Sequence, residues 1–484
     1  MNLTNLSVQQ IAAKINEKEF SPAELGAALS RRGTHAQKEL TLFISFDPQS
    51  IAREIKRIEQ NVQVKDNRLL GVPVALADNI STGDQKTTCA SRLLASYQPP
   101  FEARVVSLLK ESGALLTGKT NLEEFGLGCS GESSFLNQVK NPWDKKYTAG
   151  SGAAAAVASG LTTLALASDA RGELRQAASY CGIMALKPTY GRISRKGLID
   201  CASSLEQLGI LARRASDLAL TLQVLAGPEA DNPTTLPTEA PPYADLLEKI
   251  SEKPRIAVPA CWDEAPYLED EVKKNFQEQL AKLGKLGLEI NFVTLPHFQY
   301  AYLVATIICA VEAFSNLSNL DGVRFGYRKE GKHLQEMYIK TRSQGFSSKL
   351  KKFLTFGGLL STAKYYHNYF LQGQKMRSII KKELEDCLQE NELLLTPTTP
   401  FKAIPAGSPL SGKELPDPAS YYTAAANLTG FPSLSFPINT GGLPYGLQFM
   451  AKRENEVILL QVASLLEKED SIKWPKFALE LQEV

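Results

Sequence analysis

The sequence has few of the residues that build metal sites and disulfide frameworks. Only four histidines occur among its 484 residues, and none has a partner at metal-ligand or catalytic-triad spacing. The seven cysteines are odd in number and never form a C-x-x-C pair, which argues against a disulfide framework and a structural zinc site. The glycines form no complete nucleotide-binding motif. We therefore expect no metal and no organic cofactor, and we interpret the cysteines as free thiols in a reducing cytoplasm.

The sequence also lacks an excess of either charge. Lys plus Arg number 54 and Asp plus Glu 52, so the net charge is +2 and no general basic field attracts a polyanion. The N-terminus lacks the basic segment and apolar run of a secretory signal. The longest uncharged stretch, 148–168, consists mostly of Ala, Gly, Ser and Thr, and we predict a buried helix and a buried strand there. These features favour a cytoplasmic protein without a membrane segment and with only indirect contact to nucleic acid.

Strand and helix patterns alternate along the chain. Ser21-Pro22-Ala23-Glu24 has the form of a capping box and predicts a helix after it, and a second amphipathic helix is expected over 49–60. Apolar runs predict strands at 71–78, 114–119, 161–169, 254–260, 289–295, 393–400 and 431–437. Helices are expected at 104–113, 153–159, 214–227 with Ser216 as its cap, and 272–287. This alternation indicates an α/β fold with a largely parallel or mixed sheet covered by helices.

Three stretches carry most of the functional information: GVPVALADN (71–79), TAGSGAAAAVASG (148–160) and SDARGELRQAASYCGIMALKPTYGRIS (168–194). With NPWD (141–144), SSLEQLGILAR (203–213) and GLPYGLQFMAK (442–452), they resemble the amidase signature family, and within it the A-type subunits of bacterial tRNA-dependent amidotransferases. Those subunits release ammonia from glutamine so that misacylated Glu-tRNA can be amidated. The resemblance covers nearly the whole chain. It implies a large mixed central sheet with helices on both faces.

The resemblance also suggests how the chain is organised. We interpret residues 1–484 as one amidase-like domain. Within it we expect a helical N-terminal segment over about 1–65, a signature core over about 66–215 and a variable middle over about 216–390. Strands and a helix of the C-terminal part should then follow over about 391–484.

The catalytic triad of the family is altered in this sequence. In the family a lysine base, a bridging serine and a nucleophilic serine act together, because a serine hydroxyl needs a hydrogen-bonded base to lose its proton. The resemblance places Ala77 at the lysine position and Glu173 at the nucleophile position. A loop between Asp144 and Gly152 is three residues shorter than the family pattern. The bridging serine therefore falls on Ala149 if the Ala-rich helix keeps its register, or on Ser151 if the gap lies later.

The turn before the nucleophile is altered as well. In the family its backbone N–H groups stabilise the oxyanion, and here it reads Ala170-Arg171-Gly172. Arg171 puts a side chain where the family pattern has a glycine, and Glu173 brings its own anion close to the N–H donors. We expect Arg171 or Arg175 to neutralise that carboxylate.

Positions that recognise the substrate in the amidotransferase subunits also differ. Ala305 and Thr306 stand where those subunits have a tyrosine, and Lys352 and Phe353 stand where they have a pair of arginines. Ser420, or a gap beside it, falls where they have an acidic residue. Loss of the arginine and the acid removes the partners of an amino acid's carboxylate and ammonium groups, so glutamine is expected to bind poorly.

These changes lead to three hypotheses. The first is a catalytically inactive pseudoenzyme, because joint loss of catalytic groups costs many powers of ten in rate. Such a protein would have a structural, regulatory or partner-binding role and would keep the surface for B-type and C-type amidotransferase subunits. The second is an active glutaminase or amidotransferase subunit with a rearranged site. An enzyme of another class, with Glu173 as a general base held by Arg171 or Arg175, is disfavoured, because a carboxylate beside a cation usually has a lowered pKa and is a weak base. The third is a sensor that binds a small molecule in the former pocket.

Overall fold

The chain is described by a computed structural model over residues 6–60, 64–249, 253–408, 417–439, 441–469 and 472–481. Within these residues eleven strands form one mixed sheet, in the order β1-β3-β2-β4-β6-β5-β10-β11-β9-β7-β8. Their bounds are β1 Phe43–Ser45, β2 Pro73–Ala77, β3 Leu115–Thr120, β4 Leu164–Asp169, β5 Met184–Lys187, β6 Gln207–Ala212, β7 Arg255–Pro259, β8 Glu289–Val293, β9 Leu393–Pro397, β10 Ser433–Ile438 and β11 Tyr445–Ala451. The predicted α/β fold with a large mixed sheet is confirmed.

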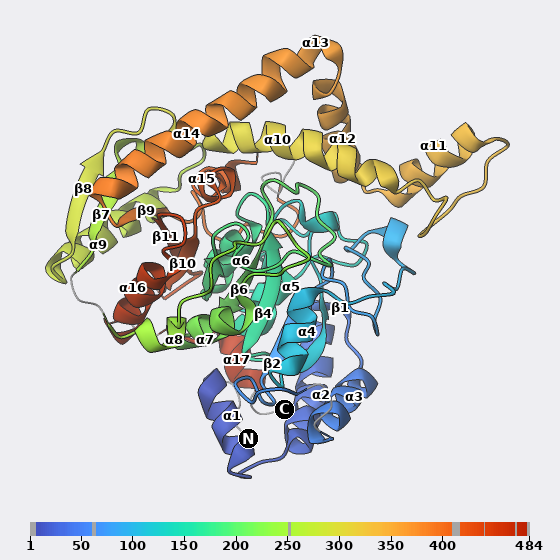
Figure 1. The fold of residues 1–484 in the computed structure, drawn as a ribbon, viewed down its shortest axis with the longest axis horizontal. Helices are drawn as coiled ribbons and strands as arrows, with labels where there is room; N and C mark the ends of the chain where they lie inside the picture. The colour runs from blue at the N-terminus through green and yellow to red at the C-terminus, as the bar shows by residue number, and fades with distance from the viewer. Residues whose placement is uncertain are drawn as a thin grey trace.

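Helices cover the sheet and extend beyond it (Figure 1). Their bounds are α1 Val8–Asn16, α2 Pro22–Leu40, α3 Pro48–Glu59, α4 Arg104–Glu111, α5 Gly152–Ala158, α6 Glu173–Cys181, α7 Ala215–Leu225, α8 Tyr243–Leu246, α9 Asp270–Lys285, α10 Ala301–Asn316, α11 Leu334–Gly345, α12 Ser348–Leu360, α13 Ala363–Tyr365, α14 Leu371–Glu390, α15 Ala424–Thr429, α16 Glu456–Glu469 and α17 Lys476–Glu480. Helices α1 to α3 lie at one end of the molecule, and α10, α12 and α14 lie along the opposite side. The candidate site lies between these two groups.

The N-terminal helices begin where the sequence predicts. The Ser21 side chain accepts a hydrogen bond from the backbone N–H of Glu24, and the Glu24 side chain accepts one from the N–H of Ser21. This reciprocal pair satisfies two N–H groups that the first helical turn leaves free. Ser216, in contrast, was wrongly predicted as a cap. It lies inside the first turn of α7, whose N-cap is Arg214.

The middle of the sheet carries the signature segments. Strand β2 runs parallel to both β3 and β4, and all residues of these three strands are buried. The Ala-rich helix α5 is buried throughout and packs against β4 and β2. Its small side chains permit close approach, since a Cβ on Gly152 would lie 2.0 Å from the carbonyl oxygen of Leu42. The uncharged stretch is therefore the buried helix and strand that the sequence predicts.

One other segment is long and apolar enough to cross a membrane by length and composition, namely 298–319, which contains α10. In the structure 56% of its most apolar window is buried inside the protein. The helix contacts α12, α14 and α15. These contacts make α10 a core helix of this fold.

Candidate active site

The turn between β4 and α6 is fixed by a glycine and by a buried ion pair. Gly172 has φ of 114°, and an added Cβ would lie 2.0 Å from Oγ1 of Thr423, whose hydroxyl donates to the carbonyl of Arg171 at 2.7 Å. Asp169 lies before the turn and Arg175 after it, and the Arg175 guanidinium donates to both carboxylate oxygens of Asp169, at 2.9 and 3.1 Å. Both side chains are fully buried. The turn therefore has little freedom to change shape.

Glu173 places its carboxylate on the backbone of this turn. Its Oε2 accepts hydrogen bonds from the N–H groups of Ala170 at 2.9 Å and Arg171 at 2.7 Å. Glu173 is also the first residue of α6, where the helix dipole favours an anion. Of the two arginines expected to neutralise it, Arg171 takes that place, with Nε 3.4 Å from Oε1, while Arg175 pairs with Asp169.

Burial decides the acidity of Glu173. Its removal from water raises the pKa of the carboxyl group, and this effect outweighs the opposing influence of Arg171 and of the backbone hydrogen bonds. The expectation of a lowered pKa beside a cation was therefore wrong. A carboxylate with a raised pKa is a stronger base near neutral pH than an ordinary glutamate.

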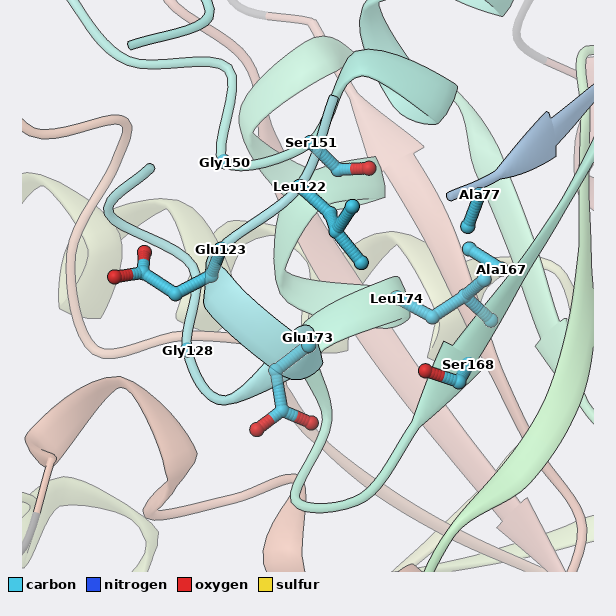
Figure 2. Close-up of a pocket in the computed structure, with 11 residues that line it drawn as sticks. Ala77, Leu122, Glu123, Gly128, Gly150, Ser151, Ala167, Ser168, Glu173 and Leu174 are labelled. Carbon is cyan, nitrogen blue, oxygen red and sulfur yellow. The ribbon is translucent and has the colours of Figure 1, made fainter. Parts of the chain in front are cut away.

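Ala77 and Ser151 meet at a small cavity behind Glu173. The cavity has a volume of about 20 Å³ and is lined by Ala77, Leu122, Glu123, Gly126, Gly128, Gly150, Ser151, Ala167, Ser168, Glu173 and Leu174. Figure 2 shows Ala77, Leu122 and Ser151 facing this space, while the carboxylate of Glu173 points away from them. A volume of this size has room for about one water molecule. A sensor's small-molecule ligand needs several hundred Å³, so this cavity does not support the sensor hypothesis.

The two positions considered for the bridging serine differ in their surroundings. Ser151 lines the cavity and caps α5, its hydroxyl accepting from the N–H of Ala153 at 3.2 Å. Ala149 is fully buried, and its carbonyl accepts a hydrogen bond from the thiol of Cys181 at 3.5 Å. A hydroxyl at the cavity is therefore supplied by Ser151.

A buried lysine near Ala77 cannot replace the missing base. Lys119 lies on β3 in register with Leu76, whereas Ala77 is in register with Thr120. Successive residues of a strand face opposite sides of the sheet, so Lys119 faces away from the cavity. Its Nζ instead lies 3.3 Å from Asp78 and 2.9 Å from the hydroxyl of Thr87.

The three substrate-recognition positions lie on elements that surround Arg171. Phe353 of α12 carries the Arg171 guanidinium over its ring, 5.3 Å from the centroid. The Thr306 hydroxyl, on α10, donates to the carbonyl of Tyr302 at 2.8 Å. The Ser420 hydroxyl, in the short 3-10 helix η8 (Pro418–Ser420), donates to the carbonyl of Asp417 at 2.7 Å. Both hydroxyls are thus engaged by their own backbone.

Three polar residues of the site were not singled out from the sequence. Glu123 lines the cavity and forms an ion pair with Lys349, Oε1 to Nζ 2.9 Å. Ser168 lines it too and accepts a hydrogen bond from the amide of Asn79 at 2.8 Å. Glu206 is fully buried, and burial raises its pKa to about 8. Ser168 and Glu206 stand in the quoted stretches SDARGELRQAASYCGIMALKPTYGRIS and SSLEQLGILAR, so their place in or beside buried strands was the available signal.

The part of the chain that the structure describes contains no set of side chains suited to bind a metal ion. No group of three or more His, Cys, Asp or Glu side chains there could hold a metal ion. The polar groups at the site include the carboxylate of Glu173, the guanidinium of Arg171 and the hydroxyls of Ser151 and Ser168.

Comparison with known proteins defines the class. The profile of the Amidase family matches residues 24–460, so the chain belongs to the amidase signature family. The solved peptide amidase of Stenotrophomonas maltophilia shares the fold, with a TM-score of 0.80 at 24% identity over 98% of this chain and 99% of that chain.

Within the family the chain is at least 30% identical, over nearly its full length, to A-type amidotransferase subunits. The A-type subunit of glutamyl-tRNA(Gln) amidotransferase from Lactobacillus gasseri is 37% identical to it, over 97% of each chain. Its counterpart from Carboxydothermus hydrogenoformans is 38% identical, over 97% of this chain and 98% of the relative. The crystal structure of the counterpart from Thermotoga maritima aligns with a TM-score of 0.79, at 30% identity and with 99% of each chain covered.

These relatives contradict the hypothesis of an inactive pseudoenzyme, and the prediction that the protein is not an enzyme was wrong. Proteins similar over the whole length bear the name of an amidotransferase subunit, which favours the alternative of an active enzyme. The hypothesis rested on the joint substitution of the triad positions. It also relied on a lowered pKa of Glu173, whereas burial raises that pKa.

Proposed function

We propose that this protein acts as the A-type subunit of a tRNA-dependent amidotransferase, releasing ammonia from an amide such as glutamine at a rearranged site. Full-length similarity to relatives that bear this subunit's name supports the proposal. The observation that carries the rearranged chemistry is the buried carboxylate of Glu173, held by the N–H groups of Ala170 and Arg171 with its pKa raised.

In this proposal Glu173 acts as a general base toward water. The carboxylate removes a proton from a water molecule whose oxygen attacks the amide carbon, and the C–N bond then breaks. The proton held by Glu173 passes to the departing nitrogen, which leaves as ammonia, and the carbonyl carbon is left as a carboxylic acid. General-base assistance of this kind typically contributes 10²- to 10⁴-fold to the rate.

Arg171 supports the same chemistry by its charge. Its guanidinium lies 3.4 Å from Oε1 of Glu173 and can stabilise negative charge that develops at the amide oxygen. In the ground state Glu173 occupies the backbone N–H groups of the turn. An attacked amide oxygen therefore depends on Arg171 more than on those N–H groups.

The partners follow from the same proposal. Relatives named as subunits support a place in a complex, and the resemblance suggests two partners, a larger one that binds tRNA and a small one. Binding of tRNA would then fall to the partner, in keeping with the net charge of +2. A cytoplasmic location belongs to this proposal as well.

The test is ammonia release from glutamine and simple amides by the protein, alone and with B-type and C-type subunits. Glu173→Gln keeps the shape but cannot accept the proton, so kcat/KM should fall about 100-fold or more. Glu278 of α9 lies on the surface with its side chain 58% exposed, so Glu278→Gln is the matched control and should leave the rate unchanged. Ammonia release that survives Glu173→Gln at full rate contradicts the proposed chemistry. Absence of ammonia release with every partner contradicts the proposed function.

A further inference from the structure

Arg171 is a buried cation with unused hydrogen-bonding capacity. Its side chain is 4% exposed, and within the described part of the chain neither Nε nor Nη1 has a hydrogen-bond partner. The one ion pair, from Nε to Glu173, is long at 3.4 Å. Buried donors without acceptors cost free energy, and native proteins rarely leave them so. Such a guanidinium is suited to an anionic ligand.

The charges around Arg171 agree with this interpretation. Burial opposes its charge, but Cys309, Glu173 and Asp417 together raise the pKa of Arg171. Burial also raises the pKa of the Cys309 thiol, which therefore stays neutral and offers no standing charge. Among the described residues the anions near Arg171 are Glu173, which the turn holds, and Asp417, whose side chain accepts from the N–H of Ala419. Neither carboxylate accepts a hydrogen bond from Nε or Nη1 of Arg171.

The location of Arg171 matches the predicted substrate-recognition positions. Phe353 of α12 stacks on it, Cys309 lies on α10 three residues after Thr306, and Asp417 caps the short helix that contains Ser420. The three elements that carry Thr306, Phe353 and Ser420 therefore converge on this one guanidinium. Position 353 carries a phenylalanine and not an arginine, but the guanidinium of Arg171 lies over its ring.

We propose that Arg171, which lies in the β4–α6 turn, binds the carboxylate of an amino-acid amide substrate. It fills the role that the resemblance gives to an arginine at the position of Phe353 on α12. This inference rests on the proposed function and names its substrate class. A guanidinium binds a carboxylate through charge-assisted N–H bonds, and Nη1 and Nε of Arg171 both have donors without acceptors. The Glu173 carboxylate beside it then faces the reacting end of the same substrate.

The experiment compares a charged and a neutral amide. Arg171→Gln should lower kcat/KM for glutamine roughly 10- to 100-fold more than kcat/KM for butyramide, which has no carboxylate, because loss of charge beside the reacting atoms affects both amides and loss of the charge-assisted pair affects glutamine alone. Arg324, a surface residue, provides the control Arg324→Gln, which should leave both substrates unaffected. An equal loss for both amides would mean that Arg171 acts only on the reacting atoms and not on a substrate carboxylate, and it overturns the assignment.

A charge swap and a binding measurement keep the test independent of folding and of turnover. Arg171→Gly with Phe353→Arg returns the cation to α12 and should recover glutamine affinity that Arg171→Gly alone loses. Binding of L-glutamate is followed by the shift in melting temperature. If no amide is turned over, the proposed function fails, but a stabilisation by glutamate that Arg171→Gln abolishes still supports the site. Equal stabilisation of both proteins by glutamate, or of neither, refutes it.

Discussion

Loss of the buried Arg175 cation should destabilise the whole protein measurably. Arg175 donates to both oxygens of Asp169, to the carbonyl of Thr423 at 3.1 Å and to the side chain of Asn427 at 2.6 Å, with no exposed surface. In Arg175→Leu the carboxylate of Asp169 stays buried without its cation. Removing one partner of such a pair costs about 3–5 kcal/mol.

The size of the expected shift follows from the length of the chain. An unfolding entropy of about 2.1 cal/mol/K per residue gives about 1 kcal/mol/K for 484 residues, so Arg175→Leu should lower the Tm by about 3–5 °C. Scanning calorimetry measures this shift, with the surface variant Arg324→Leu as control.

A double variant separates the buried charge from lost packing. Asp169→Asn combined with Arg175→Leu removes both charges, while the asparagine can still accept a hydrogen bond from Asn427. The double variant should therefore regain at least half of the lost Tm, because no uncompensated charge remains. A Tm loss in the double variant equal to the sum of the two single losses would refute this reasoning, and so would a shift below about 1 °C for Arg175→Leu alone.

Three further predictions concern stability and accessibility. Burial lowers the pKa of Lys187 to about 7, whereas a lysine in an unfolded chain has a pKa of about 10.4. Between pH 7 and about pH 10 the unfolded state therefore binds more protons than the folded state, so Lys187 makes the stability of the protein rise with pH. Lys187→Met should therefore be more stable than the wild type at pH 7, by a margin that shrinks toward pH 10, and a margin independent of pH would contradict this. Gly172→Ala should cost about 1–3 kcal/mol because its Cβ would meet Thr423, whereas Gly442→Ala, with no atom within 4 Å, should be nearly neutral in urea unfolding. Of the seven free cysteines only Cys261 and Cys387 are partly exposed, so a thiol reagent should label at most two in the native protein and all seven in denaturant; labelling of a third native thiol would contradict the buried positions.

Much of the sheet could be predicted because its strands are continuous apolar runs. Strands β2, β3, β4 and β7 lie within the predicted ranges or extend one residue beyond them, since each is buried on both faces. Strands β1, β5, β6 and β11 were not predicted. The four residues Met184–Lys187 are stabilised by antiparallel pairing with β6 and β10, and local sequence contains no signal for that pairing. The long helices α10, α12 and α14 were missed for a related reason, because α10 packs against both α12 and α14 and these tertiary contacts leave no signal in the local sequence.

The candidate active site, like the sheet, has features that could be predicted from the sequence and features that could not. The turn that holds Glu173 could be predicted from nine contiguous residues, and the backbone hydrogen bonds of its carboxylate follow from that local geometry. The stacking of Arg171 on Phe353 could not, because these residues are far apart in the sequence and meet only through the tertiary packing that places α12 against α10. The raised pKa of Glu173 was also beyond reach, since it depends on complete burial by surrounding elements.

The most direct test of the central claim is ammonia release from glutamine by the protein assembled with B-type and C-type amidotransferase subunits, measured beside Glu173→Gln in the same complex. A rearranged but active site predicts steady ammonia release by the wild type and a loss of about 100-fold or more in the variant. No ammonia from the wild-type complex, or an equal rate from the variant, would contradict the claim that Glu173 serves as the base of an active amidase.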